Sequence, residues 1–164
     1  MNKKKEAFIG YYIKKYSSPK LPPMWMSIHL LTFKELVILY QNISYKNLKS
    51  RIASTYGLKD PVLSSWMRSL SDLRNFCAHH SRIWNRVFGS NAVLPKVKPK
   101  HWLKYLPGSI GNNKIVPKKS LYYQVVIIWY FLSQMNIYST WLERVEALSK
   151  EHNIDMIYLR FPLN

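Results

Sequence analysis

The segment from Asp60 to Phe88 constrains the fold of this chain more than any other. Its first half carries apolar residues at helical spacing, namely Leu63, Trp66, Met67, Leu70, Leu73 and Cys77. This rhythm predicts an amphipathic helix with one buried stripe. Asp60 and Pro61 suit its start, because a carboxylate can cap free N–H groups and proline fits the first turn. We expect the helix to run through His79 to Phe88 with a bend.

Polar residues interrupt the apolar pattern in the second half of this segment. At about 100° per residue, Arg74 projects from within the buried stripe, where it needs an anionic partner or a wet cavity. Asn75 and His79 are four residues apart and share the neighbouring face. On an ideal helix Arg74 and His79 lie about 140° apart around the axis and about 7.5 Å apart along it. They therefore cannot both face one phosphate unless the arginine curls round or the helix ends.

These residues carry a family resemblance. Arg74-Asn75-x-x-x-His79 resembles the R-x4-6-H signature of HEPN-domain ribonucleases, with a polar residue after the arginine. The longer string RNFCAHHSRIWNR is similar to the hallmark of abortive-infection proteins of the AbiD/AbiF type, and PPMWM at residues 22–26 also fits that family. The resemblance implies an all-α, HEPN-like helical bundle forming one domain over residues 1–164. It also implies that this chain corresponds to the C-terminal portion of a longer AbiF-type protein.

The same resemblance implies a function. The chain would be a metal-independent endoribonuclease of a bacterial phage-defence or toxin–antitoxin system, needing no metal or other cofactor. His79 would act as acid/base, Arg74 would bind phosphate and Asn75 would position the other groups. The products would carry a 2′,3′-cyclic phosphate and a 5′-hydroxyl. The partners would be a target RNA, a noncoding antitoxin RNA and a second copy of the chain, with the motif helices at a two-fold interface.

The charge of the chain points to a polyanion independently of the motif. There are 25 lysine and arginine residues against 8 acidic residues, which gives a net charge of +17. Such a surplus repels itself unless a polyanion offsets it, so nucleic acid is the first expectation and an anionic membrane surface the second. The single cysteine and the lack of a recognisable signal peptide predict a cytoplasmic protein.

Further candidates for RNA contact lie after the motif. They are His80, Arg82, Asn85 and Arg86, and then Lys96, Lys98, Lys100 and Trp102 in a basic, proline-rich loop over residues 89–119. Lysines interleaved with aromatic rings suit single-stranded nucleic acid. The alternatives are ion pairing and helix capping for the first group and a solvated basic loop, with its aromatic rings packed on the core, for the second. Trp84 is expected in the core rather than as a platform for a ligand.

The remaining chain predicts five more helical regions. They are Lys3–Tyr16, Trp25–Asn42 with a break near Thr32, Ser44–Tyr56 stopped by Gly57, Leu121–Asn136 capped by Ser120, and Trp141–His152 with a Thr140/Glu143 capping box. The apolar run at residues 121–132 is shorter than the roughly 20 residues that a membrane span needs, so we interpret it as a buried core helix.

Two other hypotheses compete with that of a ribonuclease. A non-catalytic RNA-binding module, which binds a noncoding RNA or another partner, explains the charge equally well, and a membrane-surface protein is the third hypothesis. A zinc site built on Cys77, His79 and His80 is disfavoured because structural zinc needs four ligands, usually in two spaced pairs.

Overall fold

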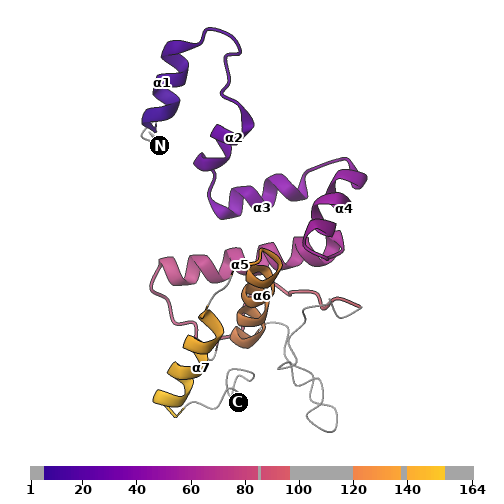
Figure 1. The fold of residues 1–164 in the computed structure, drawn as a ribbon, viewed down its shortest axis with the longest axis vertical. Helices are drawn as coiled ribbons and strands as arrows, with labels where there is room; N and C mark the ends of the chain where they lie inside the picture. Colours follow the sequence, from indigo (N-terminus) through magenta and orange to yellow (C-terminus); the bar gives the residue numbers. More distant parts are fainter. Residues whose placement is uncertain (1–5, 85, 97–119, 138–139, 154–164) are drawn as a thin grey trace.

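The computed structural model describes residues 6–84, 86–96, 120–137 and 140–153. All regular structure within these ranges is helical, which confirms the predicted all-α class (Figure 1). The elements in chain order are α1 (Ala7–Lys15), α2 (Met24–Ser27), a 3-10 turn η1 (Ile28–Leu30), α3 (Phe33–Gln41), α4 (Lys46–Thr55), α5 (Asp60–Ala78), α6 (Leu121–Gln134) and α7 (Trp141–Glu151). None of the helices in the described ranges is both long enough and apolar enough to cross a membrane.

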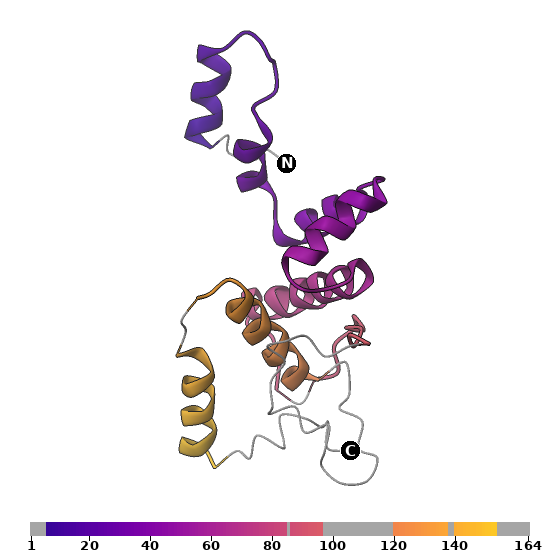
Figure 2. The same cartoon turned by 45° about the vertical axis from the view of Figure 1, so that its right-hand side comes forward.

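The N-terminal segment that carries α1 and α2 stands away from α4–α7 in both views (Figures 1 and 2). Ile9 and Tyr12 of α1 are buried, and the Tyr12 hydroxyl donates a hydrogen bond to the Pro19 carbonyl at 3.3 Å. The segment therefore folds back on itself. It leaves large apolar side chains exposed, among them Leu21 and Trp25.

Local chemistry explains where the central helices begin and end. The predicted break at Thr32 is confirmed by a complete capping box, in which Thr32 Oγ1 accepts from the Glu35 amide and Glu35 Oε2 accepts from the Thr32 amide. Ser120 caps α6 as predicted, by accepting from the Tyr123 amide. The expected capping box at Thr140 was wrong, because the Thr140 side chain makes no cap hydrogen bond.

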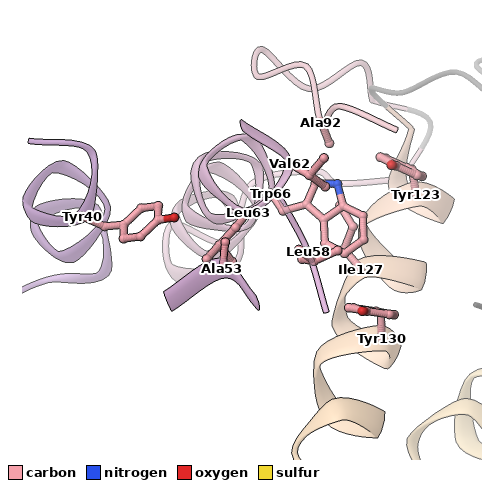
Figure 3. Packing of buried hydrophobic residues seen from close by; sticks show 10 residues of the cluster. All are labelled: Tyr40, Ala53, Leu58, Val62, Leu63, Trp66, Ala92, Tyr123, Ile127 and Tyr130. Carbon is pink, nitrogen blue, oxygen red and sulfur yellow. The ribbon is translucent and has the colours of Figure 1, made fainter. Parts of the chain in front are cut away.

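The core is organised around Trp66, which lies in the first half of α5. The side chain is fully buried and meets the rings of Tyr123, Tyr130 and Phe131 of α6 edge-on at centroid distances of 6.4, 5.4 and 5.9 Å. Figure 3 shows Trp66 between α6 and the residues contributed by α3, α4 and the start of α5. The prediction of a buried core helix at residues 121–132 is thus confirmed.

A buried polar pair lies beside this aromatic core. The Gln124 side-chain amide of α6 donates to Ser69 Oγ of α5, and both side chains are fully buried. Gln124 Oε1 has no hydrogen-bond partner among the described residues. The pair fixes the register of α6 on α5, because any slip would leave both groups buried without partners.

The segment after α5 returns across the middle of that helix. The Trp66 indole donates to the Val93 carbonyl at 2.8 Å, the Tyr123 hydroxyl donates to the same carbonyl at 3.2 Å, and the Val93 amide donates to Ser65 Oγ at 3.0 Å. Phe88 and Ala92 are fully buried. The chain is thus bound to α5 and α6 before the basic loop, whose residues 97–119 lie outside the described ranges.

Candidate functional site

The candidate site lies where α5 ends. The helix stops at Ala78, so the prediction that it continues to Phe88 was wrong. The stop is a Schellman motif in which the Ser81 amide donates to the Phe76 carbonyl at 2.9 Å and the His80 amide donates to the Cys77 carbonyl at 3.1 Å. His79 is the residue that follows the last helical one, and His80 adopts a positive φ of 49°.

Histidine is an unusual residue at this position of the motif. The same pair of hydrogen bonds closes α4 with Gly57 at φ 63° and α6 with Asn136 at φ 51°. Glycine and asparagine are the usual choices there, because a Cβ disfavours the left-handed conformation. A left-handed histidine therefore places a second imidazole directly after His79, at a position that the backbone geometry alone would give to glycine or asparagine.

Arg74 does not project into the core as the helical wheel predicted. Its side chain is exposed, and its Nη1 donates to Asn75 Oδ1 at 3.1 Å. Cys77, which was also placed on the buried stripe, is exposed as well. The stripe is buried only where other elements cover it, and this end of α5 lies on the opposite side of the molecule from α4 (Figure 1). A helical wheel drawn from the sequence cannot show at which residue of α5 the packing against other elements ends.

Among the described residues, no carboxylate forms an ion pair with Arg74 or His79. The acidic side chains between residues 60 and 96 are Asp60 and Asp72. Asp60 accepts from the Tyr40 hydroxyl at 2.8 Å and lies 3.6 Å from Lys49 Nζ, while Asp72 accepts from Ser90 Oγ. Within the described ranges, therefore, neither carboxylate is bound to the motif. Arg74 and His79 are exposed to solvent and open to an external anion.

Ser81 and Arg86 both contact Phe76 in the last turns of α5. The guanidinium carbon of Arg86 lies 3.8 Å from the centre of the Phe76 ring, and Arg86 Nη1 donates to the Arg82 carbonyl at 3.3 Å. Phe76 also packs edge-on against Phe88 at 5.8 Å. Arg86 is half-buried by these contacts and stabilises the turn. Its contact with RNA stays a prediction.

The other predicted site residues are distributed as follows. Asn75 is half-buried, while His80, Arg82 and Lys96 are exposed. Asn85, Lys98, Lys100 and Trp102 lie outside the described residues.

Trp84 was expected in the core, but it is 41% exposed, and sequence reasoning missed it as a surface feature. The available signal was its position between two arginines, Arg82 and Arg86.

An apolar cavity of about 480 Å³ lies away from this site. It is lined by side chains from η1, α3, α4, α5 and α6, including Phe33, Leu36, Met67 and Phe131. None of the described residues 74–84 and 86 contributes to it. The candidate site is therefore an exposed helix end and not part of this hollow.

Comparison with known proteins gives one result. The family model described as Abi-like protein matches residues 1–85, which is just over half of the chain and includes Arg74, Asn75, His79 and His80. No curated protein and no solved structure matches the chain.

Proposed function

Since this chain belongs to the Abi-like protein family, we propose that it is a metal-independent endoribonuclease of the HEPN type that acts in abortive infection as a phage defence. One observation carries the proposal. Arg74 and His79 are exposed at the end of α5, without a carboxylate partner in the described structure, on a chain of net charge +17. A guanidinium and an imidazole left open to solvent suit a phosphate that undergoes proton transfer.

The reaction requires no group beyond those present. The RNA 2′-oxygen attacks the adjacent phosphorus while a base removes its proton, and the bond from phosphorus to the 5′-oxygen breaks as that oxygen takes up a proton. The products carry a 2′,3′-cyclic phosphate and a 5′-hydroxyl. His79 serves in the proton transfers, and Arg74 offsets the charge that develops on the phosphorane oxygens. Asn75, which accepts from Arg74, orients the guanidinium.

We further propose that two copies of the end of α5 form one site. Arg74 and His79 are five residues apart, and the open surface of a single copy gives a scissile phosphate little shielding from water. A two-fold arrangement supplies one arginine and one histidine from each copy. Exposed Cys77 and Ala78, which lie between the two motif residues, would provide small side chains for a close contact between helices.

The test is cleavage of labelled single-stranded RNA in EDTA. We expect His79→Ala and Arg74→Ala to lower the cleavage rate at least 100-fold, since acid–base groups typically contribute 10² to 10⁴. His29→Ala and Arg51→Ala are matched controls, because both residues are exposed on other elements. These variants should cleave like the parent protein. Full activity of His79→Ala would reject the proposed chemistry.

The shared site has its own test. Mixing inactive Arg74→Ala with inactive His79→Ala should restore part of the activity, because a mixed dimer holds one intact arginine and one intact histidine. Activity that depends on protein concentration should accompany this. No recovery after confirmed subunit exchange would confine the site to one copy.

The same measurements decide the competing hypothesis of a non-catalytic RNA-binding module. That hypothesis predicts tight, salt-dependent RNA binding with no cleavage at any protein concentration, and no effect of His79→Ala. The noncoding antitoxin RNA is proposed on the same grounds, because a chain of this charge would bind it through phosphates.

A further inference from the structure

Trp84 is a large aromatic residue that follows the candidate site in the chain and is partly open to solvent. It is 41% exposed, in contrast to Trp66, which is fully buried. No hydrogen bond or ring contact engages it among the described residues, although Phe76 and Phe88 nearby do pack against each other. Part of the ring surface is therefore free to contact a ligand.

The two residues that flank the turn of Trp84, Ser81 and Arg86, both contact Phe76. The Ser81 amide is bound to the Phe76 carbonyl, and the Arg86 guanidinium stacks on the Phe76 ring at 3.8 Å. Trp84 is three residues from Ser81 and two from Arg86, so its Cα lies within about 11 Å of the first and about 7 Å of the second. The chain therefore limits how far Trp84 can lie from the turn formed by His79 and His80.

The proposed reaction requires such a group. The attacking 2′-oxygen must lie in line with the departing 5′-oxygen, and a regular helix, with its stacked bases, does not offer that geometry. The strand must be unpaired at the cleavage point, and an unstacked base exposes an apolar face. Proteins hold such bases by stacking them on aromatic rings, while arginine and lysine follow the phosphates. Exposed Arg82, two residues before Trp84, suits the second role.

We propose that Trp84 is a stacking platform for an unpaired nucleobase of RNA bound at the end of α5. The inference rests on the proposed function and adds that the substrate is single-stranded at this point. Trp84 discriminates bases from bare phosphates, whereas the charges of the chain do not. It is a positioning residue, since it touches the substrate away from the bonds that change.

Binding to two strands of equal charge tests the proposal. One is a 2′-O-methyl RNA oligonucleotide, which lacks the attacking hydroxyl and cannot be cleaved by this chemistry. The other has the same number of phosphates but abasic residues throughout. We expect the parent protein to prefer the strand with bases. Trp84→Leu should weaken its binding to that strand about tenfold and leave its binding to the abasic strand unchanged, in keeping with the typical contribution of one stacked base.

Three further variants sharpen the result. Trp84→Phe should keep most of the preference, because a smaller ring still stacks. Trp25→Leu is the matched control, since Trp25 is 68% exposed on the N-terminal segment, and it should bind both strands like the parent. Arg82→Ala should weaken binding to both strands equally and reduce the salt dependence by about one phosphate contact. Circular dichroism of each variant checks that the helices are retained.

The outcomes separate this inference from the proposed function. If Trp84→Leu keeps the full preference for bases, Trp84 is not the platform, while RNA binding and cleavage still stand. If the parent protein binds both strands equally well, no base is stacked and the inference fails alone. If the parent protein binds neither strand and does not cleave RNA, the inference and the proposed function fail together.

Discussion

The two ends of α5 differ sharply in their surroundings. In the first two thirds, Leu63 and Trp66 are buried in the main core, and Ser69 is enclosed by Gln124 of α6. Beyond Leu73 the side chains of Arg74, Cys77 and Ala78 are exposed although they continue the same helix, and so is that of His79, which follows it. Packing thus accounts for the residues of the first part and leaves these side chains of the second uncovered. The difference teaches that substitutions at the exposed helix end should cost the fold less than substitutions in the packed part.

The largest expected effect contrasts two tryptophans. Trp66→Ala should lower the free energy of unfolding by about 3–5 kcal/mol, because it empties the centre of the core. Trp84→Ala should lower the unfolding free energy by only about 1–2 kcal/mol, because 41% of the residue is already exposed in the folded state. Urea unfolding followed by circular dichroism measures both. Equal losses in the two variants would contradict the distinction between the two ends.

Alkaline pH should lower the free energy of unfolding through the buried tyrosines of the packed region. Burial raises the pKa of Tyr123 and Tyr130 above the ordinary value of 10, and burial together with the neighbouring Asp60 carboxylate raises that of Tyr40. The folded state then holds its phenolic protons above pH 10 while the unfolded chain releases them. Below pH 10 these tyrosines should leave the free energy of unfolding unchanged. Above pH 10 each tyrosine should lower it by up to about 1.4 kcal/mol per pH unit.

Urea midpoints measured between pH 8 and pH 11 check this expectation. Tyr40→Phe should make the decline less steep, whereas Tyr11→Phe, at an exposed position of α1, should not alter it. If the urea midpoint falls with pH equally steeply in the parent and in Tyr40→Phe, Tyr40 does not contribute to the decline.

The buried polar pair should show a smaller and non-additive effect. Ser69→Ala leaves the Gln124 amide buried without its acceptor and should destabilise the fold by about 1–3 kcal/mol. Adding Gln124→Leu removes both polar groups, including the unpaired Oε1, and should recover most of that loss. A double-mutant cycle in urea measures the coupling, and strictly additive losses would argue against the pair.

The smallest effect is expected at His80. Glycine accepts φ of 49° without a Cβ, so His80→Gly should raise the unfolding free energy by about 0.5–1 kcal/mol. His80→Ala removes the same imidazole but keeps the Cβ, so it should not be stabilised. If His80→Gly is stabilised and yet binds RNA less tightly than the parent, the histidine is retained for its side chain. A destabilised His80→Gly would indicate an unrecognised packing role.

Local signals predicted most of the fold from the sequence. The break at Thr32, the stop at Gly57 and the start of α6 at Ser120 each rest on a hydrogen bond within a few residues, and all three are present. The Thr140 cap failed although its pattern was equally good. A capping pattern states which bond can form, and the surrounding chain decides whether it does.

The candidate site was less predictable, because the exposure of its residues depends on where the elements that cover α5 end. The helical wheel gave correct directions for Leu63, Trp66 and Leu73 and failed for Arg74 and Cys77, where no neighbour continues the core. The stop after Ala78 was missed because histidine, unlike glycine, is not a common signal for a left-handed cap. The exposure of Trp84 followed from that early stop.

The anchoring of Val93 has a consequence for the segment that follows α5. Its carbonyl accepts from Trp66 of α5 and from Tyr123 of α6, so one backbone group joins both helices to the chain that follows the motif. A substitution that removes either donor would therefore loosen this crossing point together with the aromatic core, because the two hydrogen bonds share one acceptor.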